Sequence, residues 1–202
     1  MGAGYVAMKG AAMGFLVLLA ILLVVLTYFI MLYNGLVALK HNIAKAWANI
    51  DVLLKQRHDE LPKLVETCKQ YMQYEQETLE KVMKARAQVS AARESQNMGA
   101  LGAAEAQLRG MIGNLFAVAE AYPELKANEN FQHLQGRITG LENAIADRRE
   151  FYNDSVNLNN VRIEQFPDVI VARMFNFQPA DLLEFDAAET ADVSVKQLFG
   201  SL

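Results

Sequence analysis

Cysteine, proline and tryptophan are rare in this chain, with one, four and one among 202 residues. A single cysteine, Cys68, excludes an internal disulfide framework and a cysteine-based zinc site. It stands at an apolar position of a helical pattern, where a small buried hydrophobe is expected. Glycine and proline are scarce through the middle of the sequence, which is rich in Ala, Leu, Gln, Glu, Lys and Arg. Because these residues favour helices, the composition predicts an all-α protein.

The sequence also lacks the motifs of common catalytic and metal sites. Its three histidines, His41, His58 and His133, form no His-Glu-x-x-His pair, and the Glu-x-x-His pair of di-iron bundles does not occur. Nucleophile elbows, phosphate-binding glycine loops and dinucleotide fingerprints are absent too. The net charge is −4 with both signs scattered, so no basic patch suits nucleic acid. We therefore expect a non-enzyme with no metal, no cofactor and no nucleic-acid partner.

One uncharged stretch, Met13 to Leu32, has the length and composition of a membrane-spanning helix. About 20 apolar residues cross a hydrocarbon core of ~30 Å. A cleaved signal peptide is the rival interpretation, but its apolar region would be shorter and would end in small residues. We expect a lead over residues 1–12, a transmembrane helix over 13–33 and a bilayer as the first partner.

Two glycines, Gly10 and Gly14, have the GxxxG spacing that lets membrane helices approach closely. Small residues are frequent here, so the spacing can also arise by chance. The functional interpretation predicts self-association, and thus a homo-oligomer.

Residues 34–165 show apolar positions spaced by three and four, which is typical of a helical bundle. The pattern shifts by one residue at Leu61-Pro62, where proline disfavours helical geometry. We interpret this as a reversal of the chain, although a kinked continuous helix would give the same shift. The expected fold is thus a transmembrane helix followed by an antiparallel four-helix bundle, with helices over residues 34–57, 62–92, 101–122 and 128–163.

The last stretch, 166–202, changes character and is expected to be an irregular tail. Its candidates for docking onto the bundle, a partner or the bilayer are Phe166, Pro167, Phe175 and Phe177. Residues 193–199 are the one plausible short strand. We favour burial of the tail across one end of the bundle.

Five polar residues lie near the predicted seams: Arg57, Asp59, Arg148, Arg149 and Asn153. Charged groups at such positions are costly unless paired. An internal ion-pair or capping network that fixes helix register is the simpler interpretation. The sharper one is a recognition or ligand site at the Pro62 corner.

Several segments together resemble the LemA family of bacterial membrane proteins. The resemblance covers residues 33–177, and its segments are Tyr33-Asn34, Ala46-Trp47, Ile50-Asp51-Val52, Leu61-Pro62, Ala85-Arg86, Glu120 to Asn128, Tyr152-Asn153 and Phe166-Pro167. It implies an N-terminal anchor followed by an antiparallel four-helix bundle, and it supports the reversal at Pro62. One departure is the missing second basic residue before the proline. One branch of the family is associated with magnetosome membranes, which implies a membrane-organising role by analogy.

These observations predict a non-enzymatic, single-pass scaffold or interaction module in a bacterial cytoplasmic membrane. A membrane-tethered sensor that binds a ligand through the polar face around Arg57 and Arg148 is the alternative. Lysines flank both ends of the apolar run, so charge does not decide the orientation. The family resemblance favours a bundle outside the cytoplasm, with membrane or envelope proteins as partners.

Overall fold

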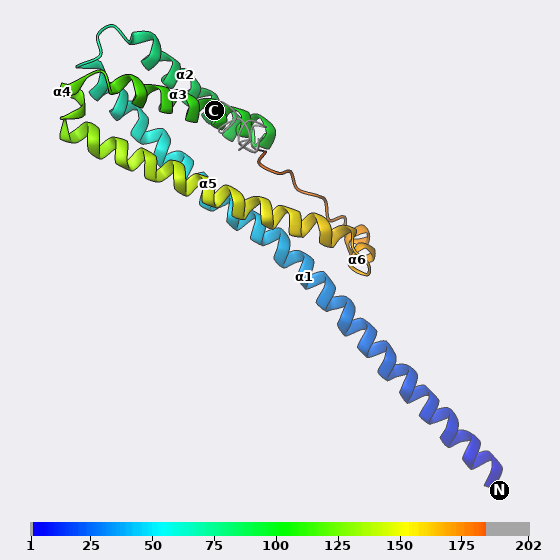
Figure 1. Ribbon diagram of the computed structural model, residues 1–202. Helices are drawn as coiled ribbons and strands as arrows, with labels where there is room; N and C mark the ends of the chain where they lie inside the picture. Colours follow the sequence, from blue (N-terminus) through cyan, green and yellow to red (C-terminus); the bar gives the residue numbers. More distant parts are fainter. Residues whose placement is uncertain (1, 185–202) are drawn as a thin grey trace, which may run out of the picture. The chain divides into compact units, whose positions relative to one another are not determined.

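The computed structural model describes residues 2–184, and this part of the chain is helical with no strand. Six helices follow one another along the chain (Figure 1). They are α1 (Gly2–Lys69), α2 (Gln76–Glu94), α3 (Met98–Ala119), α4 (Pro123–Lys126), α5 (Glu129–Glu164) and α6 (Asp168–Met174). The predicted all-α fold with a long N-terminal apolar helix is confirmed. The predicted strand at 193–199 lies outside the described residues.

The described residues form two compact units. The first, here called the anchor unit, contains residues 2–44 and 157–180. The second, here called the bundle unit, contains residues 45–156 and 181–184. Helices α1 and α5 each contribute residues to both units.

The apolar segment of α1 has the properties expected of a membrane span. Within the described residues, α1 is the one helix long and apolar enough to cross a membrane, and none of its most apolar window is buried. Large side chains such as Leu18, Val24 and Met31 are more than half exposed. An apolar surface of this kind needs lipid around it.

The bundle unit consists of four long helical segments that alternate in direction, from α1, α2, α3 and α5 (Figure 1). Short turns join them, as expected for antiparallel neighbours. Asn97 and Asn128 begin α3 and α5 by accepting hydrogen bonds from the amides of Ala100 at 2.9 Å and Phe131 at 3.0 Å. The core contains residues from all four segments, including Leu61, Leu64, Cys68, Leu79, Val82, Leu101, Leu108, Leu115, Ile138 and Ile145.

The predicted reversal at Pro62 is wrong, because α1 continues through this residue to Lys69. The reversal lies later, between Lys69 and Gln76. The buried positions show why both patterns fit one helix. Residues 46, 50, 54, 57, 61, 64 and 68 are all buried, so spacings of three and four pass through the proline without a break.

A contact from α2 explains how the helix tolerates Pro62. Proline has no amide proton, so the carbonyl of His58, four residues earlier, loses its helical hydrogen bond. Arg86 Nε donates to this same carbonyl at 2.8 Å. Arg86 Nη2 also lies 2.6 Å from His58 Nε2. The side chain from α2 thus supplies the donor that the proline lacks.

The described residues after α5, up to residue 184, make contacts within each of the two units. In the anchor unit, α6 buries Val171 and Ala172 in a cluster with Leu36 and Ile163. In the bundle unit, Leu183 is buried. The predicted irregular tail is therefore wrong for residues 168–174, which form the helix α6, and its residues from 185 on lie outside the described part of the chain.

Candidate functional site

The most deeply buried charged group of the bundle is Arg57 of α1, which is 1% exposed. Its Nη2 donates to Glu105 Oε1 of α3 at 2.5 Å, and its Nη1 donates to Glu142 Oε1 of α5 at 2.6 Å. Glu105 is 4% exposed. One guanidinium therefore ties together three of the four helical segments. Because two carboxylates must both reach it, the arrangement fixes the register of these helices.

Burial and the neighbouring charges act in opposite directions on the pKa values of Arg57 and Glu105. Burial alone would lower the pKa of Arg57, but the charges of Glu105 and Glu142 outweigh burial and raise it. Burial raises the pKa of Glu105, and the adjacent Arg57 opposes this rise. Arg57 therefore stays protonated, and the carboxylates depend on it for their stability in the interior.

A second arginine completes the cluster, and it is Arg149 rather than Arg148. Arg149 is 5% exposed and lowers the pKa of Glu105 by its charge. Arg148 is exposed, so its predicted place on the seam is wrong by one residue. Asp59 is exposed as well, so it lies outside this buried cluster. The sequence analysis found Arg57 and Arg149 but missed Glu105 and Glu142, their partners.

The cluster encloses too little space for a ligand. The void lined by Glu105, Glu142 and Arg149 measures about 10 Å³, about the volume that one water molecule requires. Arg109 of α3 lines the same void. In chemical terms the cluster can hold helices together, and its geometry leaves no access for a substrate.

Two asparagines of α5, Asn153 and Asn160, form hydrogen bonds with the backbone of the segment after α6. In the bundle unit, the side chain of Asn153 donates to the Leu183 carbonyl at 3.1 Å and accepts from the Leu183 amide at 2.9 Å. In the anchor unit, Asn160 does the same with the carbonyl and amide of Ala180, at 2.9 and 3.0 Å. Each amide side chain thus pairs with an extended backbone as a neighbouring strand would.

Other contacts support the same segment. The hydroxyl of Tyr152 donates to the Asp181 carbonyl at 3.0 Å. The backbone of Glu184 passes so close to Gly102 that a side chain at this glycine would collide with it. Asn153 was a predicted site residue, but Asn160 was not. The sequence could have indicated Asn160, because it lies two helical turns after Asn153 and therefore on the same face of α5.

The aromatic candidates of the tail differ in their contacts within the anchor unit, and Phe175, although it touches two rings of α1, is still 49% exposed. The ring of Phe175 lies 4.7 Å from that of Tyr33 and 6.2 Å from that of Phe29. Phe177 packs on Tyr33 with ring centroids 5.9 Å apart. Phe166, by contrast, is 76% exposed. Pro167, which follows it in a cis peptide bond, is half-buried.

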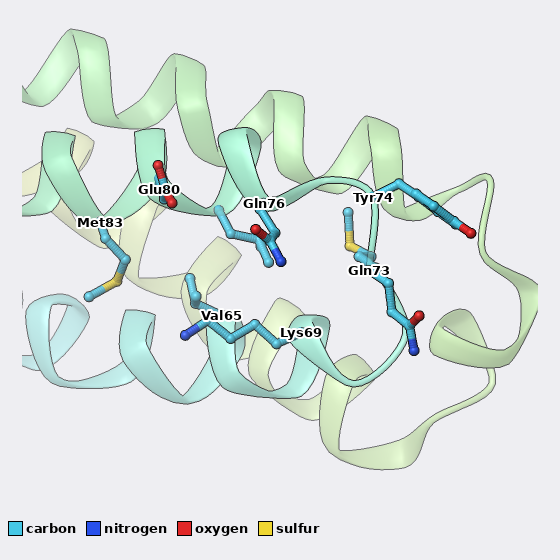
Figure 2. Close-up of a pocket in the computed structure, with 9 residues that line it drawn as sticks. Val65, Lys69, Gln73, Tyr74, Gln76, Glu80 and Met83 are labelled. Atoms are coloured by element: carbon cyan, nitrogen blue, oxygen red, sulfur yellow. The ribbon is translucent and has the colours of Figure 1, made fainter.

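Among the described residues, two hollows outside the apolar segment of α1 are large enough to hold a small molecule. In the bundle unit, about 730 Å³ opens beside the turn between α1 and α2. Figure 2 shows Lys69 and Gln76 reaching into this space while Tyr74, which is 93% exposed, points away from it. In the anchor unit, about 520 Å³ lies between α1 and the segment after α6, beside Lys40 and Asn159.

Metal-binding chemistry is not indicated in the part of the chain that the structure describes. No group of three or more His, Cys, Asp or Glu side chains there could hold an ion. Cys68 is fully buried, and burial raises the pKa of its thiol to about 12. The expectation of a buried cysteine is confirmed.

Comparison with known proteins gives one family. A family model described as the LemA family matches residues 46–197. Magnetosome proteins MamQ 2 and MamQ 1 of Paramagnetospirillum magneticum are each 30% identical over 91 residues, which is 45% of this chain and 34% of those proteins. Magnetosome protein MamQ of Magnetospirillum gryphiswaldense is 26% identical over the same length. The matched stretch thus spans about a third of each relative.

Proposed function

The chain belongs to the LemA family, and from this premise we propose that it works as a non-catalytic scaffold that organises membrane proteins, including copies of itself. It is a membrane-associated helical protein, with an N-terminal apolar helix that can span a bilayer. The finer role rests on the chemistry of its interior and on its relatives.

The observation that carries the proposal is the charged cluster of Arg57, Glu105, Glu142 and Arg149 in the bundle unit. Arg57 joins three helical segments through its two carboxylate partners, and the void beside them, about 10 Å³, is too small for a substrate. A bundle stabilised in this way presents side chains to partners on its outside. The names of the relatives, which place them with the magnetosome, support a membrane-organising role.

The alternative function, a ligand sensor acting through Arg57 and Arg148, has less support. Arg57 is buried and paired with two carboxylates, whereas Arg148 is exposed. The hollow of about 730 Å³ beside Lys69 is the observation that favours ligand binding. It lies at the turn that replaces the predicted Pro62 corner.

Self-association of the full chain in its native membrane tests the scaffold proposal. We expect amine-reactive cross-linking of intact membranes, followed by purification through a tag after Leu202, to give dimers and larger species. The control is the same protein cross-linked after dilution into excess detergent. A strictly monomeric product from intact membranes, with no co-purifying membrane protein, contradicts the proposal.

We further propose that the membrane is the bacterial cytoplasmic membrane and that the bundle lies outside the cytoplasm. Protease treatment of intact spheroplasts should then remove a tag placed after Leu202. A tag that survives until lysis places the bundle in the cytoplasm and directs the search to cytosolic partners.

A further inference from the structure

Helix α6 has an exposed face with large apolar side chains, and neither the packing of the bundle nor the proposed scaffold function explains their exposure. Its inner face buries Asp168, Val171 and Ala172. Its outer face presents Ile170, Arg173 and Met174, spaced by three and four. Ile170 is 52% and Met174 is 64% exposed, and the preceding Phe166 is 76% exposed. Large apolar side chains gathered on one helix face indicate a partner.

The position of α6 on α1 identifies this partner. The cluster that contains Val171 and Ala172 packs against Phe29, Leu32, Tyr33, Leu36 and Leu39 of α1, all within the anchor unit. If the hydrocarbon core begins at Met13, ~20 residues at ~1.5 Å each bring its far edge close to Leu32. The α6 layer therefore flanks α1 where the span leaves the hydrocarbon and enters the headgroups.

The length of the uncharged run supports this placement. From Gly10 to Leu39 no residue is charged, and at ~1.5 Å per residue this run measures about 45 Å. That is longer than the ~30 Å hydrocarbon core but matches the ~40–45 Å that includes both headgroup layers. The part of the uncharged run that extends beyond the hydrocarbon core after Leu32 is also the part of α1 on which α6 packs.

We propose that α6 is an interfacial membrane element, whose face of Phe166, Ile170, Arg173 and Met174 contacts the lipids of the same bilayer that α1 crosses. Because the inner face of α6 packs on Phe29, Leu32 and Tyr33 at the end of the exposed apolar stretch of α1, one bilayer can contact both that stretch and the outer face of α6. Arg173 suits such a site because its apolar stem lies among acyl chains while its guanidinium reaches lipid phosphates. The proposal rests on the membrane association of α1 and is independent of the scaffold function.

Lipid-borne quenchers test the proposal on the full chain. Single cysteines replace Ile170 or Met174, carry an environment-sensitive fluorophore and are reconstituted in vesicles of phosphatidylcholine and phosphatidylglycerol. Nitroxide groups are placed either near the headgroup or deep in the acyl chain. Cys68 is fully buried, so the wild-type chain is the labelling blank. A label at Val24→Cys, in the span, is the positive control for quenching by nitroxides deep in the acyl chain. A label at the exposed Gln107→Cys of α3 measures the background quenching away from the membrane.

We expect labels at residues 170 and 174 to be quenched by headgroup nitroxides at least about twofold more than the label at residue 107. Helicity measured by circular dichroism has to match that of the wild type. Quenching no greater than the background overturns the proposal. Self-quenching that grows with protein density, without quenching by lipid, also overturns it, because a second copy of the chain then covers the face.

Discussion

A guanidinium as deeply buried as that of Arg57 loses its hydration, and only close carboxylates can offset this loss. Arg57 has two of them, on two other helices. Its Nε is buried and has no hydrogen-bond partner, so the compensation relies on the two terminal nitrogens. Single replacements within the cluster should therefore differ sharply from replacements of exposed arginines.

Arg57→Met is expected to reduce the free energy of unfolding by ~3–5 kcal/mol, because it leaves Glu105 buried without its main counter-charge. Adding Glu105→Gln removes the uncompensated charge, so the double variant should be more stable than Arg57→Met alone. Thermal unfolding of the full chain in mild detergent, followed by circular dichroism, measures both. Arg148→Met is the matched control at an exposed site, with an expected change within ~0.5 kcal/mol. Equal losses at residues 57 and 148 would contradict this account.

His58 gives a dependence of stability on pH. Burial, followed by the charge of Arg86, lowers the pKa of His58 below its usual value of 6.5. The unfolded chain then binds the proton more readily than the folded chain. The contribution of neutral His58 is therefore complete above pH 6.5 and is lost as the pH falls through the folded-state pKa.

The measurement compares the unfolding midpoints of the wild type and His58→Gln between pH 8 and pH 5. Since His41 and His133 are present in both proteins, the difference between the curves isolates His58. We expect the wild type to lose more stability than the variant on acidification. Parallel curves would show that His58 does not contribute.

At the scale of elements, the sequence predicted the helices better than the turns. The seam of Leu61, Val65, Cys68, Met72, Leu79 and Val82 is buried as expected, and α5 lies within one residue of its predicted start and end. Pro62 misled the prediction because local rules for proline consider only its own helix. The donor that compensates for it, Arg86, comes from another helix, and only tertiary structure brings the two together.

A double-mutant cycle tests the contact between Arg86 and the His58 carbonyl. Arg86→Met should cost ~1–2 kcal/mol in the wild type, because it leaves that carbonyl without a donor. In a Pro62→Ala background the residue at position 62 regains its amide, so the same change should cost less. Unfolding measured as above gives the coupling energy, with the exposed Lys84→Met of α2 as control. An identical cost in both backgrounds would refute the compensation.

The extended segment after α6 depends on single asparagines, which makes its attachment testable in isolation. Asn153→Ala should free the Leu183 amide, because Asn153 Oδ1 is its acceptor. Hydrogen exchange at Leu183 should accelerate by about tenfold or more, which corresponds to ~1.4 kcal/mol of lost protection. The exposed Asn157→Ala on the same helix is the matched control. Unchanged exchange at Leu183 would show that Leu183 packing alone holds the segment.

At the scale of the whole molecule, the span, the bundle and the family were all predictable from the sequence, because each leaves a long periodic or apolar pattern. The ion-pair partners Glu105 and Glu142 were not, since they lie 48 and 85 residues from Arg57 and look like ordinary helix-surface glutamates in sequence. Orientation in the membrane could not be predicted either, because Lys9 and Lys40 flank the apolar run at its two ends.

The spacing of Gly10 and Gly14 predicts that the whole molecule associates with itself through its membrane span. Gly10 and Gly14 lie on α1 with no other residue within 4 Å of where a side chain would begin, so their surface is free to meet a second helix. Gly10→Ile with Gly14→Ile should reduce cross-linked dimers in native membranes at least about threefold, because the larger side chains keep two backbones apart. Ala20→Ile adds similar bulk at another exposed position of the span and should leave the dimers unchanged. If both variants retain wild-type cross-linking, the glycines are not the contact, and any self-association has to use another surface of the protein.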